Sequence, residues 1–245
     1  VGAAGGHPWL SKVPPGPESL TPEERVLTLL VANAAAGRAA DVKVDWRHLP
    51  AEHHAAGMEA LLQNHVLIGF PRTINSLAAV HEVGVSREGR ASWAEEAPDA
   101  DASTVGRATL QEIYGGKYER LRARMETLHP LLDRFMEEHA YGRVLGRGGA
   151  LSIRMRELCT VAVLAGQPDV APQMTSHVYG SLNVGATIEE VRAVVEQARL
   201  VFGEEAFASA STTLTEVSTR AGRRVLAAPL GPDGEGAGGA AGEMG

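Results

Sequence analysis

Side chains suited to proton transfer and anion binding gather within residues 141–203. They occur in three motifs: Arg154-Met155-Arg156-Glu157-Leu158, His177-Val178-Tyr179-Gly180 and Thr187-Ile188-Glu189-Glu190. A histidine titrates near neutral pH and a carboxylate can orient it, so these residue types favour general acid/base chemistry. Cys159 is the only cysteine of the chain. An internal disulfide and a two-cysteine redox cycle within one chain are therefore excluded.

Helix signals recur along the chain and provide the elements that would position these side chains. Thr21 and Thr187 each begin a capping box, with a glutamate three residues later. After Thr187, apolar residues return at spacings of three and four, as on one buried helical face. A further helix is predicted over 152–165. No stretch alternates with period two, and aromatic residues make up only 4% of the chain, so we expect an all-α fold.

Composition separates the ends and the middle of the chain from the rest. Residues 1–19 and 223–245 are rich in glycine with little to bury, and are predicted to be disordered tails. Residues 86–140 are predicted to be a polar linker followed by a connecting helix from Tyr118 to His139. The apolar stripe of that helix comprises Leu121, Met125, Leu128, Leu132 and Phe135. Its arginines are interpreted as a solvated face rather than an anion site: Arg120, Arg122 and Arg124.

The two remaining segments, 20–85 and 141–222, show a weak internal repeat. Four pairs of positions align: Leu20 with Leu151, Arg25 with Arg156, Gln63 with Gln197, and Gly69 with Gly203. The offset of the last two pairs is three residues larger than that of the first two, which indicates duplication with one small insertion. The N-terminal copy is degenerate, because Val26 stands where the second copy has Glu157. We expect it to supply scaffold or one wall of a pocket.

The order of the motifs resembles the carboxymuconolactone decarboxylase family, whose superfamily includes the alkylhydroperoxidase AhpD-like proteins. The resemblance covers Tyr141 to Ala208 well and the N-terminal half only faintly. It implies an all-helical fold assembled into trimers or hexamers of units. In the peroxidase branch two cysteines precede the histidine, and the corresponding positions here are Gln173 and Val170. Without sulfur there, thiolate attack on a peroxide has no nucleophile. Cys159, expected to be a buried small hydrophobe, is no substitute.

For the decarboxylase branch, the resemblance implies a cofactor-free enzyme that removes CO₂ from a γ-carboxylated unsaturated lactone. Loss of CO₂ leaves a dienolate, which needs a donor near its oxyanion and an acid to reprotonate carbon. On this resemblance His177 is the general acid/base and Glu157 the carboxylate that orients it. Arg147 or Arg156 would bind the substrate carboxylate. Tyr179 would be an auxiliary donor.

Two other functions stay open: an AhpD-like redox protein and a non-catalytic oligomeric scaffold. The site residues also have structural interpretations, with His177 as a hydrogen-bonded histidine between helices and Arg147 as a solvated loop residue. Glu157 and Arg156 would then serve only at a helix start. No cofactor is expected, and no metal, because no i,i+4 pair occurs among the clustered histidines His48, His53, His54 and His65.

Charge and hydropathy limit the possible partners. The formal net charge of −7 argues against nucleic-acid binding, whose affinity rests on neutralising phosphates. No apolar run is long enough to span a membrane, and the first residues lack the layout of a signal peptide, so a cytoplasmic protein is expected. The expected partners are a small carboxylate or lactone substrate and, by analogy with the family, other copies of the chain, with a trimer favoured.

Overall fold

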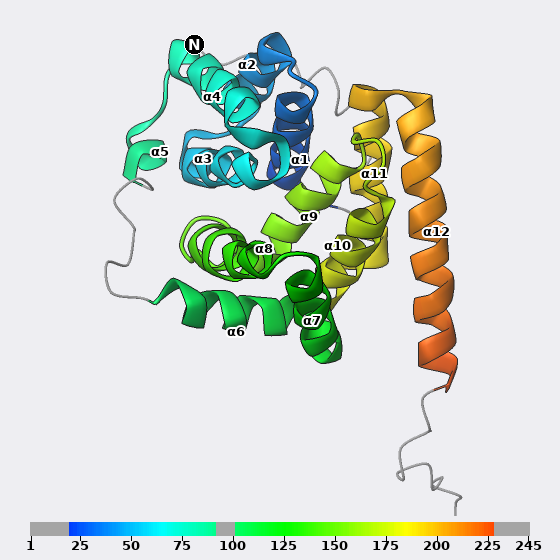
Figure 1. Ribbon diagram of the computed structural model, residues 1–245. Coiled ribbons are helices and arrows are strands. Elements are labelled where there is room, and N and C mark those ends of the chain that lie inside the picture. The colour runs from blue at the N-terminus through cyan, green and yellow to red at the C-terminus, as the bar shows by residue number, and fades with distance from the viewer. Residues whose placement is uncertain (1–19, 92–100, 228–245) are drawn as a thin grey trace, which may run out of the picture.

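The computed structural model describes residues 20–91 and 101–227, which form helices and no strand (Figure 1). This confirms the all-α prediction. The N-terminal helices are α1 (Pro22–Ala35), α2 (Ala39–His48), α3 (His54–Gln63), α4 (His65–Val83) and α5 (Arg87–Ala91). The middle holds α6 (Ala102–Tyr114), α7 (Tyr118–Leu128), α8 (Pro130–Phe135) and a π-helix (Met136–Leu145). The C-terminal helices are α9 (Ile153–Leu164), α10 (Ala171–Asn183), α11 (Ile188–Phe202) and α12 (Glu204–Ala227).

The helix starts follow the caps that the sequence predicts. The Thr21 hydroxyl accepts a hydrogen bond from the Glu24 amide at 3.3 Å, and the Glu24 carboxylate accepts one from the Thr21 amide at 3.0 Å. Thr187 and Glu190 form the same reciprocal pair at the start of α11. Each box satisfies amides that the first helical turn leaves unpaired.

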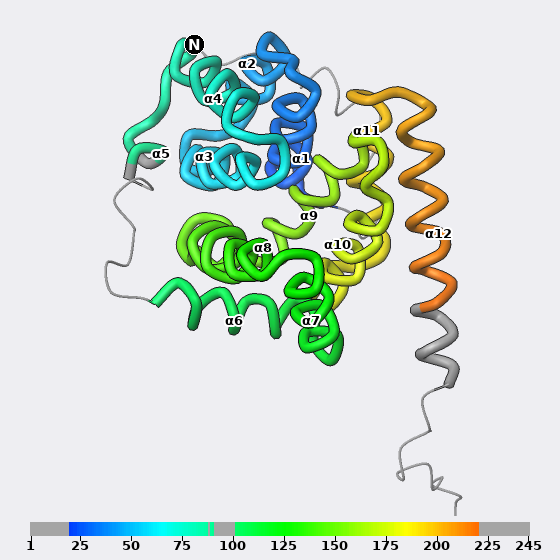
Figure 2. Tube along the Cα trace, in the orientation of Figure 1, coloured from blue at the N-terminus to red at the C-terminus, as the bar shows by residue number. Residues whose placement is uncertain are grey.

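Helices α1 and α9 pack together at the centre of the molecule, between the remaining N-terminal helices and α10–α12 (Figures 1 and 2). One continuous apolar core joins them with α2, α3, α10 and α11, and its most buried side chains include Leu30, Leu61, Leu158 and Val194. A smaller core lies between α6 and the π-helix, around Ile113. The residues of α9 that carry the predicted site therefore lie on a helix of the continuous core.

The aligned glycines of the predicted repeat have the same backbone conformation. Gly69 lies inside α4 with φ 75° and ψ 166°, and Gly203 lies directly before α12 with φ 87° and ψ −177°. A positive φ is readily adopted only by glycine. The helix order α1–α4 followed by α9–α12 is what two copies of one unit would give.

The segment 118–139 is not the single helix predicted from its apolar stripe. Helix α7 ends at Leu128, His129 adopts an extended conformation (φ −168°, ψ 122°), and Pro130 begins α8. Proline disfavours a helical conformation in the residue before it and suits a first helical position, which explains the break. The stripe is consequently split, and Leu128, Leu132 and Phe135 are 62%, 48% and 60% exposed.

Glycines allow α6 and the π-helix to approach very closely. A Cβ atom at Gly106 would lie 1.9 Å from the backbone oxygen of Glu137, and one at Gly142 would lie 2.1 Å from that of Ala102. Side chains at either position would push the two helices apart. Of the polar linker predicted to precede Tyr118, α5 and α6 are helical and residues 92–100 lie outside the described residues. The tails predicted at 1–19 and 223–245 also lie outside them, except that α12 reaches Ala227.

No described helix combines the length and the apolar character needed to cross a membrane.

Candidate active site

Helices α9 and α10 bring Glu157 and His177 together. The Nδ1 atom of His177 lies 2.9 Å from the Oε2 atom of Glu157. The Glu157 side chain is fully buried, and that of His177 is 11% exposed. An ionised carboxylate can only accept, so Nδ1 carries a proton when Glu157 is charged. This leaves Nε2 as the ring nitrogen available to a bound molecule.

Gly180 makes the room that the Glu157 carboxylate needs. It follows His177 by three residues on α10, and a Cβ atom there would lie 2.6 Å from Oε2 of Glu157. The other carboxylate oxygen, Oε1, is buried and has no hydrogen-bond partner among the described residues. A buried carboxylate with a single polar partner depends strongly on that partner. The arrangement therefore holds the His177 ring in a defined orientation.

Two tyrosines that sequence analysis gave no role lie beside His177. The hydroxyl oxygens of Tyr114 and Tyr141 are 2.6 Å apart, and the Tyr114 ring lies edge-on to His177 with 6.5 Å between centroids. Burial raises the pKa of both hydroxyls, and the nearby charge of Glu157 raises it further. Both tyrosines thus remain neutral; one hydroxyl donates to the other, and the second can donate to a bound molecule.

His177, Tyr114 and Tyr141 line a cavity of about 330 Å³. Its walls come from α4, α6, α7, the π-helix, α9 and α10, and most of the lining residues are apolar, including Val66, Leu67, Leu121, Met125, Met136 and Leu145. A mostly apolar cavity with a few convergent polar groups is the usual form of a small-molecule site. Glu157 supports His177 from outside this lining.

The three residues predicted to bind substrate do not line this cavity. Both oxygens of Glu59 accept hydrogen bonds from Arg147, at 3.0 and 3.1 Å, and Oε2 also accepts one from Arg156 at 2.7 Å. Burial alone would raise the pKa of Glu59, but the two guanidinium groups outweigh it and lower that pKa. Arg147 and Arg156 thus join the C-terminal half to α3, which corrects their assignment to a substrate carboxylate.

Tyr179 also points elsewhere. It follows His177 by two residues, about 200° further around the helix, and the ammonium group of Lys117 lies 3.9 Å from the centroid of its ring. The structure therefore gives Tyr179 a cation–π contact in place of a role as donor in the cavity.

Cys159 lies on α9 and is fully buried. Burial raises the pKa of its thiol to about 12, so the thiolate is scarce at neutral pH. Its inert character agrees with the sequence-based interpretation.

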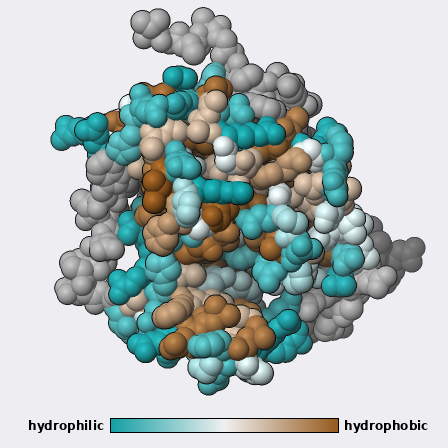
Figure 3. Space-filling view, turned by 45° about the horizontal axis from the view of Figure 1, so that its top comes forward, coloured by the Kyte–Doolittle hydropathy of each residue, from teal (hydrophilic) through white to brown (hydrophobic). Residues whose placement is uncertain are grey.

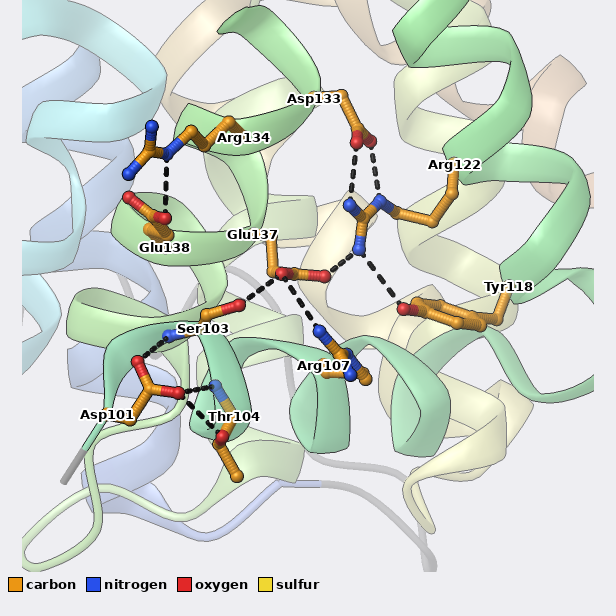
Figure 4. Close-up of polar contacts among 10 residues, drawn as sticks. All are labelled: Asp101, Ser103, Thr104, Arg107, Tyr118, Arg122, Asp133, Arg134, Glu137 and Glu138. Carbon is orange, nitrogen blue, oxygen red and sulfur yellow. Dashed lines mark hydrogen bonds and ion pairs between the residues drawn. The ribbon is translucent and has the colours of Figure 1, made fainter. Parts of the chain in front are cut away.

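A polar network fastens the helices that cover the cavity (Figure 4). Arg122 on α7 donates to both oxygens of Asp133 on α8, each at 2.6 Å, and pairs with Glu137 of the π-helix. Glu137 also accepts a hydrogen bond from Ser103 on α6. Arg122 therefore links three helices through ion pairs. The sequence-based interpretation of this residue as part of a solvated face was wrong.

No group of three described histidine, cysteine, aspartate or glutamate side chains is arranged to hold a metal ion.

Comparison with known proteins places the site within a recognised family segment. Residues 130–216 match the sequence profile of the carboxymuconolactone decarboxylase family. Over 134 residues the chain is 34% identical to "Peroxisomal protein 2" of Schizosaccharomyces pombe, and the alignment covers 54% of this chain. It spans 62% of the length of that relative. The segment that contains Glu157 and His177 is thus similar in sequence to the carboxymuconolactone decarboxylase family, the resemblance that the order of its motifs indicates.

Proposed function

We propose that the chain is a decarboxylase-like enzyme that uses acid/base chemistry, without a metal or organic cofactor, on a small carboxylated or lactone metabolite. The observation that supports this most is the 2.9 Å contact between His177 and buried Glu157 beside an apolar cavity. A buried carboxylate stabilises the imidazolium, and an imidazolium can deliver a proton to carbon.

The proposed reaction breaks the bond between the substrate carbon and its carboxylate. The electron pair of that bond passes into a dienolate while CO₂ leaves. The oxyanion of the dienolate accepts a hydrogen bond from the neutral Tyr114 hydroxyl, and His177 then transfers a proton from Nε2 to carbon. Water restores the proton of His177. An apolar surround favours this step, because charge is dispersed as CO₂ departs.

The same geometry disfavours the redox alternative. A peroxidatic thiolate must be accessible and acidic, whereas the Cys159 thiol is fully buried with a raised pKa.

The proposed function is tested by measuring CO₂ release from γ-carboxylated unsaturated lactones with the full chain and with His177→Gln. We expect release by the wild type and a loss of roughly 10²-fold or more in the variant, because the acid is removed. Equal turnover by the two proteins would remove His177 from the mechanism. Dithiol-dependent consumption of hydroperoxide that is lost in Cys159→Ser would support the redox alternative instead.

We also propose that the chain forms homo-oligomers, with a trimer favoured. Apolar surface is exposed in several patches on the face shown in Figure 3. Large apolar side chains are exposed on α4 (Phe70 65%, Ile74 59%) and on the α7–α8 region (Leu128 62%, Phe135 60%), and such surface is typical of contact sites. Light scattering after gel filtration measures the assembly, and a monomer would contradict the proposal. The cytoplasmic location stays a prediction, since the name of the yeast relative refers to the peroxisome.

A further inference from the structure

The cavity beside His177 contains a cation that the mechanism does not use. Among the described residues that line it, Arg124 alone carries a permanent charge. Leu121, Arg124, Met125 and Leu128 all line the cavity from α7. Their spacing of three and four residues places them on one face of that helix. Arg124 is therefore a guanidinium set within the apolar face that α7 turns toward the cavity.

The other candidate arginines are already engaged. Arg147 and Arg156 pair with Glu59, and Arg122 pairs with Asp133 and Glu137. Arg124 forms no ion pair with any described acidic residue, and it is exposed whereas His177 is largely buried. It thus stands at the outer end of the cavity, with its charge available to a ligand.

We propose that Arg124 is the residue that binds a substrate carboxylate, and that this carboxylate is the one that the reaction leaves in place. The inference rests on the proposed function. A guanidinium that grips a carboxylate stabilises its negative charge. That interaction would oppose the loss of the same group as CO₂, because the departing carboxylate must give up its charge. The departing group therefore belongs in the part of the cavity near His177 and Tyr114, away from Arg124.

This placement specifies the kind of molecule that stays bound after CO₂ has left. It is an organic acid with one carboxylate at Arg124 and an apolar body along Leu121, Met125 and Met136. A phosphate ester or a sugar acid would leave polar groups against those apolar walls without partners. Arg124 lies before residues 130–216, so it is not part of the matched family segment.

The experiment uses the full chain labelled with ¹³C at its methionine methyl groups. Met125 and Met136 line the cavity and report its occupancy, while buried Met58 and Met155 serve as internal references. The probes are trans-cinnamate and its uncharged counterpart cinnamamide, titrated into the wild type and Arg124→Gln. Arg120→Gln is the matched control, because Arg120 is an exposed arginine of the same helix that does not line the cavity.

We expect both probes to shift the Met125 and Met136 signals of the wild type, with cinnamate bound roughly tenfold more tightly, as one charge-assisted contact provides. Arg124→Gln should remove this preference and leave cinnamamide affinity unchanged, whereas Arg120→Gln should keep it. A preference that survives in Arg124→Gln, or no shift at Met125 and Met136 with either probe, overturns the inference. Failure of the proposed function has a different signature: full turnover by His177→Gln with the cinnamate preference intact.

Discussion

Gln63 and Gln197 make the same hydrogen bond in opposite directions across the molecule. The side-chain amide of Gln63 donates to the backbone oxygen of Arg156 at 2.8 Å, and that of Gln197 donates to the backbone oxygen of Arg25 at 2.9 Å. Both glutamines are buried. The predicted repeat aligns these same positions, so each of its two segments reaches the first helix of the other. This reciprocity is what two packed copies of one unit would give.

The two segments of the predicted repeat differ at the position of Glu157. Helix α9 presents Glu157 to His177, whereas the corresponding position of α1 is Val26, buried in the core. The N-terminal copy instead sends Glu59 to Arg147 and Arg156. It also contributes Val66 and Leu67 to the cavity wall. The C-terminal segment thus carries Glu157 and His177, while the N-terminal segment pairs with Arg147 and Arg156 and forms part of the cavity wall.

Replacing Glu157 with Gln should lower turnover roughly 10- to 100-fold, because the neutral amide orients His177 less well and no longer stabilises the imidazolium. The replacement has nearly the same volume, so the midpoint of urea unfolding should change little. Steady-state CO₂ release and urea unfolding measure the two effects. The control Glu189→Gln, at a half-exposed position of α11, should behave as the wild type. Full activity in Glu157→Gln would show that His177 does not need its carboxylate.

How far the sequence predicts this structure depends on where the signal lies. Predictions from local signals are confirmed: the helix caps predicted at Thr21 and Thr187 are present. The predicted pair Glu157 and His177 comes from ordered motifs on two adjacent helices, and the structure brings them into contact. Pro130 marks the break between α7 and α8. This local signal is present in the sequence, but the prediction of one continuous helix gave more weight to the apolar stripe.

Long-range partners were not predictable in the same way. Arg147 and Arg156 were assigned to substrate because their ion-pair partner, Glu59, lies in the other half of the chain. A signal did exist, since Glu59 is the one charged residue within the apolar run Gly57–Leu62, and a charge there needs a buried partner. Tyr114 reaches the cavity only through the packing of α6 on the π-helix, which no motif announces.

Replacing Gly180 with Ala should displace the Glu157 carboxylate, since the added Cβ would lie 2.6 Å from its Oε2 atom and 2.7 Å from Ile113. We expect the free energy of unfolding to fall by about 1–3 kcal/mol, as for overpacked cores, and turnover to fall with it. Gly148→Ala is the matched control, because no atom lies within 4 Å of a Cβ there. Urea unfolding measures the free energy of unfolding of both variants. Equal values for the two would mean that α10 can shift to accommodate the added Cβ atom.

Replacing Glu59 with Gln should destabilise the fold by about 3–5 kcal/mol at pH 7, because it leaves buried Arg156 without its counter-charge. Glu138→Gln removes only the exposed pair with Arg134 and should cost less than about 1 kcal/mol. Since the pKa of Glu59 is lowered in the folded state, its contribution is present above the ordinary value of about 4.5 and is lost as pH falls below it. Urea unfolding at pH 7 and pH 3.5 should therefore show the difference between wild type and Glu59→Gln shrinking in acid. A difference that stays constant would contradict this role.

Acid should loosen the contact between α4 and the π-helix, which is closed by two histidines. The Nε2 atoms of His65 and His139 lie 2.8 Å apart, a hydrogen bond that requires one ring nitrogen without a proton. Burial, the neighbouring His65 and Arg143 all lower the pKa of His139. The unfolded chain then binds the proton more readily, so stability present above about pH 6.5 is lost as pH falls through the folded-state value. Val66 and Met136 line the cavity from these same two elements, so the loosened contact should also affect the cavity.

Between pH 7.5 and pH 5.5 the wild type should lose more unfolding free energy than His139→Asn, while the control His53→Asn should lose as much as the wild type. If His139→Asn loses as much as the wild type, the histidine pair does not govern the response to acid.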